Sequence, residues 1–398
     1  MLSKEIVNQV LAKAVSTGAD FAEIFMENTQ SSNLKVMDGS VQTATTNRIY
    51  GVGIRAFKGL KSVYACTNDV TLKGLLDAAQ SVSTAIGECK QDIAINVTQK
   101  IIKDAHPSLL LPSSVHYNKK SALLKAGYAA MKSHNSEIKQ AIAILRDIEQ
   151  NTLIANSDGL FVEDRRVRTR IALQAIASNG IENQMGMESP GRSMGYELFQ
   201  NIVDIEKIAK SAAQTAITML HAPYCKAGKM TVAIESGFGG VIFHEACGHS
   251  LEATSVAKGY SEFSGKLGQQ IASTKVSAID DGTLINHWGS TNVDDEGTPA
   301  QRKLLIEKGI LKSYMIDRLG ARRMNLPLTG SGRRESYKFA PTSRMTNTYI
   351  DNGDDENETI IASINNGLYA KKMGGGQVNT TTGEFNFAVA EGYLIKNG

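Results

Sequence analysis

The sequence predicts an α+β protein, in which an N-terminal α/β domain precedes a β-rich C-terminal domain that carries a helix with a candidate metal-binding motif. Two observations predict this class. Apolar residues at helical spacing open the chain and are followed by strand-like runs. After Pro223 the chain restarts with a strand, and most later apolar segments are also strand-like. We place the domain boundary near residue 225, which gives domains 1–225 and 226–398.

Helices and hairpins alternate in the expected N-terminal domain. Gly18 ends the first helix, because glycine readily adopts the left-handed conformation at a helix C-terminus. Lys58-Gly59 and Ser157-Asp158-Gly159 are turn signals between β-rich runs and predict two hairpins. Pro107 and Pro112 indicate a connection and a sub-boundary near 107–117. In chain order we expect a helix at 2–17, strands at 21–26, 34–37, 49–57 and 60–66, helices at 71–86 and 118–133, the second hairpin, and an amphipathic helix at 201–219.

The C-terminal domain is expected to begin with a strand at 230–234, a glycine turn at 237–240 and the motif helix at about 241–258. Lys308-Gly309 predicts a further hairpin. Residues 345–350, 359–364 and 384–395 are strand-like. Asn397-Gly398 is a strong hairpin signal with no following strand, so we expect a chain that is cut short or belongs to a fragment. The domain is therefore predicted to be incomplete.

Composition and charge narrow the functional classes. The chain has 398 residues, 42% of them hydrophobic, and a net charge of +3, which disfavours nucleic acid as a partner. The arginine-rich run 165–170 lacks interleaved aromatic residues, so we interpret it as a solvated strand face. The N-terminal residues do not have the pattern of a signal peptide and no apolar run approaches about 18 residues, so we expect neither a secretory signal nor a membrane span. The cysteines at 66, 89, 225 and 247 form no CxxC pair, so we expect free thiols and a cytoplasmic location.

The most informative motif is His244-Glu245-Ala246-Cys247-Gly248-His249. Two imidazoles can bind a divalent metal, and a neighbouring carboxylate can act as a base for metal-activated water. The histidines are five residues apart, about 140° around an ideal helix, whereas the common zinc helix places them four apart. They can converge only if the helix contains a π-bulge or loosens at Gly248. The alternative interpretation is a pair of hydrogen-bonded core histidines.

A catalytic zinc usually has three protein ligands, and the sequence does not settle the third. On an ideal helix Cys247 lies about 60° from His244 but about 160° from His249, so it cannot easily serve with both. Glu252 and Glu262 offer oxygen ligands without a spacing argument that chooses between them. His287, beside Trp288, is interpreted as structural.

Three other segments carry polar or glycine-rich patterns. Asp294-Asp295-Glu296-Gly297 could bind a cation or substrate amines, but we expect a solvated turn. Gly330-Ser331-Gly332-Arg333-Arg334 lacks the ending of a phosphate-binding loop. Gly374, Gly375 and Gly376 with Gln377 allow another backbone to approach closely, which suits a groove that binds an extended peptide as an added strand; a plain bulge is the alternative.

Together these pieces resemble the TldD/PmbA family of peptidases and peptide-maturation proteins, specifically its metal-bearing TldD branch. The resemblance covers nearly the whole chain. The segments that carry it are 243–252, 294–298 (Asp-Asp-Glu-Gly-Thr), 332–337 (Gly-Arg-Arg-Glu-Ser-Tyr), 344–349 (Arg-Met-Thr-Asn-Thr-Tyr), 374–378 and the N-terminal 51–55 (Gly-Val-Gly-Ile-Arg).

The resemblance implies a zinc-dependent protease that acts on unfolded or extended peptides. His244 and His249 would be zinc ligands, Glu245 the catalytic carboxylate, and a cysteine in a segment C-terminal to residue 398 the third ligand. It also implies a hetero-oligomer with a related subunit that lacks the metal motif; a homodimer is the alternative. Two other hypotheses stay open: a non-catalytic binding or scaffold subunit of a protease complex, and a purely structural zinc site.

Overall fold

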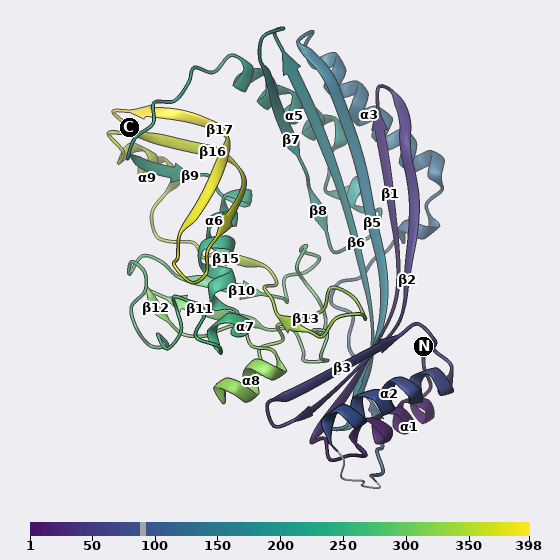
Figure 1. Ribbon diagram of the computed structural model, residues 1–398. Helices are drawn as coiled ribbons and strands as arrows, with labels where there is room; N and C mark the ends of the chain where they lie inside the picture. The colour runs from purple at the N-terminus through teal and green to yellow at the C-terminus, as the bar shows by residue number, and fades with distance from the viewer. Residues whose placement is uncertain (88–92) are drawn as a thin grey trace.

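A computed structural model describes residues 1–87 and 93–398, and Figure 1 shows its two regions. Residues 4–220 build one large sheet covered by helices. Their elements are α1 (Lys4–Val15), β1 (Phe21–Met37), β2 (Ser40–Lys58), β3 (Lys61–Thr67), α2 (Leu72–Ile86), β4 (Thr98–Gln99), η1 (Pro112–Ser114), α3 (Tyr117–His134), β5 (Ile138–Asn156), β6 (Leu160–Ser178), β7 (Asn183–Glu188), β8 (Gly191–Arg192), α4 (Leu198–Asn201) and α5 (Ile205–Leu220).

The large sheet has eight strands in the order β3-β2-β1-β5-β6-β4, and β7 and β8 also pair with β6. All pairs are antiparallel except β4 with β6. Both predicted hairpin turns lie where expected. The predicted strands 21–26 and 34–37 are wrong as separate elements, because β1 is continuous across them. Its polar middle section pairs with β2 on one side and β5 on the other, so backbone hydrogen bonds maintain the strand where the side-chain pattern weakens.

The two faces of the sheet have different partners. Ile24 and Leu34 lie on one face: Ile24 is in the core that α1 and α2 cover, and Leu34 is in the core that α3 and α5 cover. Phe25 points to the opposite face, where it packs with Val293 and Tyr337 of the C-terminal region. Successive side chains of a strand point to opposite faces. The sheet therefore lies between most of its helices and the C-terminal region (Figure 1), although Thr215 of α5 reaches Glu391 of that region at 2.8 Å.

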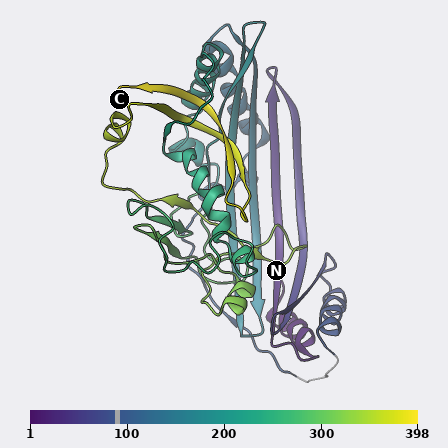
Figure 2. The same ribbon diagram turned by 60° about the vertical axis from the view of Figure 1, so that its left-hand side comes forward.

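The C-terminal region, residues 231–398, combines short strands and helices with long irregular segments. Its elements are β9 (Thr231–Ile234), η2 (Gly237–Gly240), α6 (Val241–Phe243), η3 (His244–Gly248), η4 (His249–Leu251), α7 (Ala253–Val256), β10 (Ala278–Asp281), β11 (Arg302–Glu307), β12 (Ile310–Leu311), α8 (Arg318–Met324), β13 (Gly332–Arg333), β14 (Thr342–Ser343), β15 (Thr348–Ile350), α9 (Asn357–Ala362), β16 (Asn366–Val378) and β17 (Phe385–Lys396). Figure 2 shows the long β16–β17 hairpin beside the motif helix. The domain division at residue 225 stays a prediction.

Two predicted elements of this region are wrong. Residues 359–364 fall mostly in the short helix α9 instead of a strand; the apolar pair Ile360-Ile361 fits either period. The motif helix does not reach residue 258, because Glu252 is extended (φ −76°, ψ 129°) and separates η4 from α7. Leu251 and Ala253 on either side of this break exchange backbone hydrogen bonds with Met315, which satisfies the polar groups that the break frees.

Buried ion pairs join the two regions. Arg55 of β2 donates to Glu296 at 2.8 Å, and Arg334 contacts Glu23 of β1 at 2.5 Å; all four side chains are about 1% exposed or less. The prediction of a solvated turn at Asp294-Asp295-Glu296 is therefore wrong. The acidic residues are buried because arginines from the sheet and backbone N–H groups of the C-terminal region meet them there.

The arginine-rich run of β6 is also only partly solvated. Arg165 is exposed, whereas Arg166 points toward the C-terminal region and pairs with Asp164 and Asp295. Because successive side chains of a strand point to opposite faces, Arg165 lies on the face that the helices cover elsewhere, whereas Arg166 and Arg168 lie on the face that meets the C-terminal region.

Within the described residues, no helix is long and apolar enough to cross a membrane. Cys66, Cys225 and Cys247 are free thiols, while Cys89 lies outside the described residues.

Candidate metal centre

The motif helix is a series of helical turns of different width. Gly237, with φ +75°, ends the link from β9, and the tight turn η2 leads into α6. Residues His244–Gly248 then form a π-helical turn, followed by the tight turn η4. A π turn accommodates one more residue than an α turn and is commonly found at functional sites.

The π turn brings the two histidines to the same side of the helix. The N–H of His249 donates to the carbonyl of His244, five residues earlier, which places residue 249 above residue 244. The two ring centroids are 4.9 Å apart and the ring planes are 85° to each other. Gly248 permits this path, because a Cβ there would lie 2.2 Å from the sulfur of Met345. The local distortion that the five-residue spacing requires is thus present.

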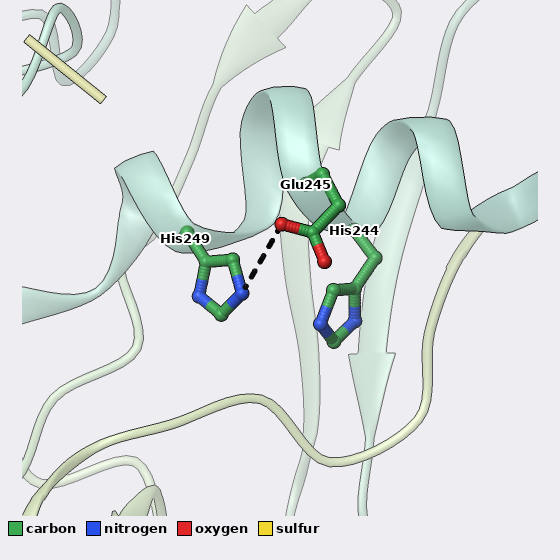
Figure 3. Close-up of side chains that lie close together, drawn as sticks. All are labelled: His244, Glu245 and His249. Atoms are coloured by element: carbon green, nitrogen blue, oxygen red, sulfur yellow. Dashed lines mark ion pairs between the residues drawn. The ribbon is translucent and has the colours of Figure 1, made fainter. Parts of the chain in front are cut away.

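Glu245 completes a group of three donors. One atom each of His244, Glu245 and His249 lies within 4.8 Å of the others, and all three residues are half-buried. Figure 3 shows their side chains on one side of the helix, with the Glu245 carboxylate between the rings. Its Oε2 lies 3.7 Å from Nε2 of His249. The motif therefore brings two imidazoles and one carboxylate close enough together to bind one metal ion.

Glu252 orients one of these imidazoles. Its Oε1 lies 3.1 Å from Nδ1 of His249, and since an ionised carboxylate can only accept, Nδ1 donates. Nε2 then keeps its lone pair and points toward Glu245. A carboxylate behind a ligating imidazole is the usual outer support of a metal site. Glu252, proposed from sequence as a direct ligand, is positioned here as that support.

Burial lowers the pKa of His244, and the neighbouring His249 acts in the same direction, while Glu245 and Glu252 oppose it. A neutral imidazole is the form that binds metal. This donor set fits zinc, which prefers nitrogen and oxygen ligands in its catalytic sites. The residues that would hold the ion are His244 and His249, with Glu245 beside them.

The other candidate ligands lie elsewhere. Cys247 packs against the apolar cluster around Phe243, where burial raises the pKa of its thiol. Glu262 is exposed and pairs with Lys266 at 2.6 Å. His287 is exposed and, like Cys247 and Glu262, lies outside the group of three donors.

The glycine-rich segment 374–377 lies inside β16, and its pairing with β17 shifts register between Met373 and Gly376. A Cβ at Gly376 would lie 2.2 Å from the ring of Phe387, and one at Gly374 would lie 2.9 Å from Ala388, so both glycines allow β17 to approach. Gly375 faces open space. Gly374 and Gly375 also line a cavity of about 670 Å³ between β16, β7 and η2.

Sequence reasoning missed two residues that support the centre. Met345 packs against Gly248, and Arg344 lies 3.7 Å from Glu252. Both belong to a segment that the sequence marked only as part of a family pattern. No spacing rule relates them to a helix almost 100 residues earlier in the chain.

Two imidazoles and a carboxylate on one helical face, with a second carboxylate behind one imidazole, form a group that could hold a metal ion. Sequence models of the PmbA/TldA metallopeptidase family match the chain in three parts: domain 1 at residues 22–86, the central domain at 110–220 and the C-terminal domain at 227–398. The chain belongs to this PmbA/TldD family.

Individual relatives agree with this assignment. The chain is 34% identical over 388 residues to the metalloprotease TldD homolog of Haemophilus influenzae, covering 95% of this chain and 80% of that protein. It is 25% identical over 401 residues to the zinc metalloprotease TldD homolog of Saccharolobus solfataricus, covering 97% and 85%. The fold is similar to the crystal structure of a candidate modulator of a DNA gyrase from Thermotoga maritima, with a TM-score of 0.81 and 21% identity, covering 99% and 88%.

Proposed function

We propose that this chain is the metal-bearing subunit of a zinc-dependent protease that cleaves unfolded or extended peptides, in peptide maturation or degradation. The single observation that carries the proposal is the π turn at His244–Gly248. It brings together two imidazoles that an α-helix would separate. A pair of core histidines would not need this distortion or the carboxylate between the rings.

In this proposal His244 and His249 hold the ion, and Glu252 fixes the orientation of His249. When bound, zinc would supply an acidified water and polarise the scissile carbonyl. Glu245 lies beside both imidazoles, so its carboxylate can take the proton from the attacking water. The same carboxyl group can then pass the proton to the leaving amine. Half-burial of the three residues limits bulk water around them.

The open edge of β16 supports binding of an extended peptide. β9 pairs with β16 only at Gly367–Ala370, after which the chain turns away into η2. In the described part of the chain no strand pairs with this side of β16 beyond residue 370. An extended peptide could add here as a strand, which would explain tolerance of many sequences. Phe238 and Gly239, at the start of the motif helix, line the adjoining cavity with Gly375.

The proposal retains two features that the family resemblance implies. One is a cysteine as third zinc ligand, in addition to His244 and His249. The other is assembly with a related subunit that lacks the metal motif, with a homodimer as the alternative. Co-expression with such a subunit, followed by size-exclusion chromatography of the mixture, tests the second feature.

Metal content and proteolysis of matched variants test the enzyme. We expect close to one zinc per chain in the wild type, its loss in His244→Ala, and its retention in Glu245→Gln without turnover of an unfolded casein substrate. Proteolysis by Glu245→Gln would refute the role of Glu245. A wild-type protein that contains no metal and is as stable as His244→Ala would favour the scaffold hypothesis. Unfolding by a chelator without any activity to lose would indicate a structural zinc.

A further inference from the structure

A small pocket beside the motif helix is lined by four arginines. It lies between β6 and the C-terminal region, has a volume of about 40 Å³, and receives Arg166 and Arg168 from β6 with Arg333 and Arg344 from the C-terminal region. A buried water needs roughly 10–15 Å³ by the same measure, so the pocket holds on the order of three water-sized groups. That is the size of a carboxylate group.

Only one of the four guanidinium groups is fully paired. Arg166 contacts Asp164 at 2.9 Å and Asp295 at 2.5 Å. Arg168 donates through Nε to the carbonyl of Trp288 at 3.2 Å, and Arg333 donates to the carbonyl of Met345 at 3.3 Å. Among the described residues, neither Arg168 nor Arg333 has a carboxylate within 4.0 Å.

The two carboxylates that line the pocket are already engaged. Asp295 accepts from Arg166 and from the backbone N–H of Arg334. Asp294 accepts from three backbone N–H groups, those of Glu296, Thr298 and Gly332. Neither can rotate toward Arg168 without losing these bonds.

The unpaired arginines repel one another. Burial, followed by the charges of Arg166 and Arg333, lowers the pKa of Arg168 to about 10. Burial and the charge of Arg344 lower the pKa of Arg333. Arg333 is exposed, and Arg168 and Arg344 are half-buried, so solvent reaches the pocket; like charges held this close together are still less unfavourable when an anion joins them. Guanidinium groups present paired donors that match the two oxygens of a carboxylate.

Two residues that line the pocket also contact residues of the motif helix. Met345 lines it and packs against Gly248 of the π turn. Arg344 lines it and lies 3.7 Å from Glu252, which binds His249. Through these two side chains the pocket is linked to the π turn and to the carboxylate that supports His249.

We propose that Arg168, Arg333 and Arg344 form a subsite that binds a carboxylate of the peptide, either its C-terminal α-carboxylate or an acidic side chain near the cleaved bond. The proposal rests on the proposed function for its substrate class, but carboxylate binding can be measured without turnover. It makes the chain selective for acidic or C-terminal segments, beyond the sequence-tolerant contacts that strand addition provides.

Binding of three short peptides tests the subsite. The probes are N-acetylated Ala-Ser-Ala-Ala with a free C-terminus, the same peptide as a C-terminal amide, and an amide peptide in which glutamate replaces the last alanine. Dissociation constants are measured by calorimetry at low salt with zinc-loaded Glu245→Gln protein and with chelator-treated wild type. We expect at least one carboxylate peptide to bind about tenfold more tightly than the neutral amide, since charged hydrogen bonds contribute more than neutral ones.

Variants of the pocket arginines show which residues cause the preference for carboxylate peptides. Arg168→Gln and Arg333→Gln should each reduce the preference severalfold, and Arg168→Lys should retain part of it. Arg165→Gln is the matched control, because Arg165 is exposed on the other face of β6 and should leave the preference unchanged. Equal binding of all three peptides would overturn the proposal, as would a preference that survives both glutamine variants. If Arg168→Gln does not fold, the proposal is tested with Arg333→Gln and Arg168→Lys, which must both reduce the preference for carboxylate peptides.

The peptide arms also distinguish the source of the carboxylate. Tight binding of the free acid alone identifies the C-terminus, and tight binding of the glutamate amide identifies an acidic side chain. Failure of the proteolytic proposal would appear separately, as absent turnover in a zinc-loaded wild type that still prefers carboxylate peptides.

Discussion

The carboxylate of Glu252 lies 3.1 Å from Nδ1 of His249, at the point where the motif helix ends. The helix break that the sequence did not reveal is therefore part of the centre. It turns Glu252 back toward the imidazole three residues earlier, so that the other ring nitrogen points to the donor group.

We expect Glu252→Ala to weaken zinc binding about 10- to 100-fold, which is the usual effect of removing a carboxylate behind a ligating histidine. Glu252→Gln should have an intermediate effect, because its amide oxygen still accepts from Nδ1 without the charge. Competition with a chromogenic chelator measures the affinity. Glu262→Ala is the control, since Glu262 is exposed and pairs with Lys266. Unchanged affinity in Glu252→Ala would contradict the supporting role.

Neighbouring glycines of β16 should respond differently to substitution. Gly375→Val should leave stability intact, because a Cβ there meets open space, but should raise KM for a peptide that adds to this edge. Gly376→Ala should lower the free energy of unfolding by about 1–3 kcal/mol, because its Cβ would overlap Phe387 and the carbonyl of Asn386. Urea unfolding and peptide kinetics separate the two effects. An unaltered KM in Gly375→Val would argue against strand addition here.

Arg55 should be one of the most stabilising polar residues. Arg55→Met leaves Glu296 buried near 1% exposure without its cation, while Glu23 keeps Arg334, so we expect a loss of about 3–5 kcal/mol in the free energy of unfolding. Arg48→Met on the same strand should change it by less than about 0.5 kcal/mol, because Arg48 is exposed. Urea unfolding of both variants checks this expectation, and similar losses would show that the buried pair is not special.

His106 should make stability depend on pH. Its Nδ1 accepts from the N–H of Asn286 at 3.2 Å, and burial lowers its pKa below the ordinary 6.5. As pH falls below 6.5 the unfolded chain takes up this proton more readily than the folded chain, so the folded state loses stability. We expect wild type to lose more stability than His106→Gln between pH 7 and pH 5, measured by urea unfolding at each pH. A larger loss in His106→Gln would reverse the expected sign.

Turn residues and apolar periodicity predicted those helices and hairpins that are determined by residues close together in the sequence. The hairpin turns at Lys58-Gly59 and Ser157-Asp158-Gly159, and the helices α2, α3 and α5, follow from turn chemistry and apolar period. The five-residue spacing of His244 and His249 also required a distorted helix if they were to meet, and the π turn provides it. The roles of these residues in zinc binding and catalysis stay predictions.

The sequence by itself determined the mixed helix and sheet class, the family and the geometric demand of the motif. Only the tertiary structure decided the environment of the motif: the support of His249 by Glu252, the packing of Met345 on Gly248, and the burial of Asp294, Asp295 and Glu296. Only the tertiary structure revealed the arginine pocket as well. The sequence of β6 shows which of its side chains share a face, but it does not show that the C-terminal region packs against that face. Burial and charge pairing depend on which distant segments meet, and a one-dimensional pattern does not contain that information.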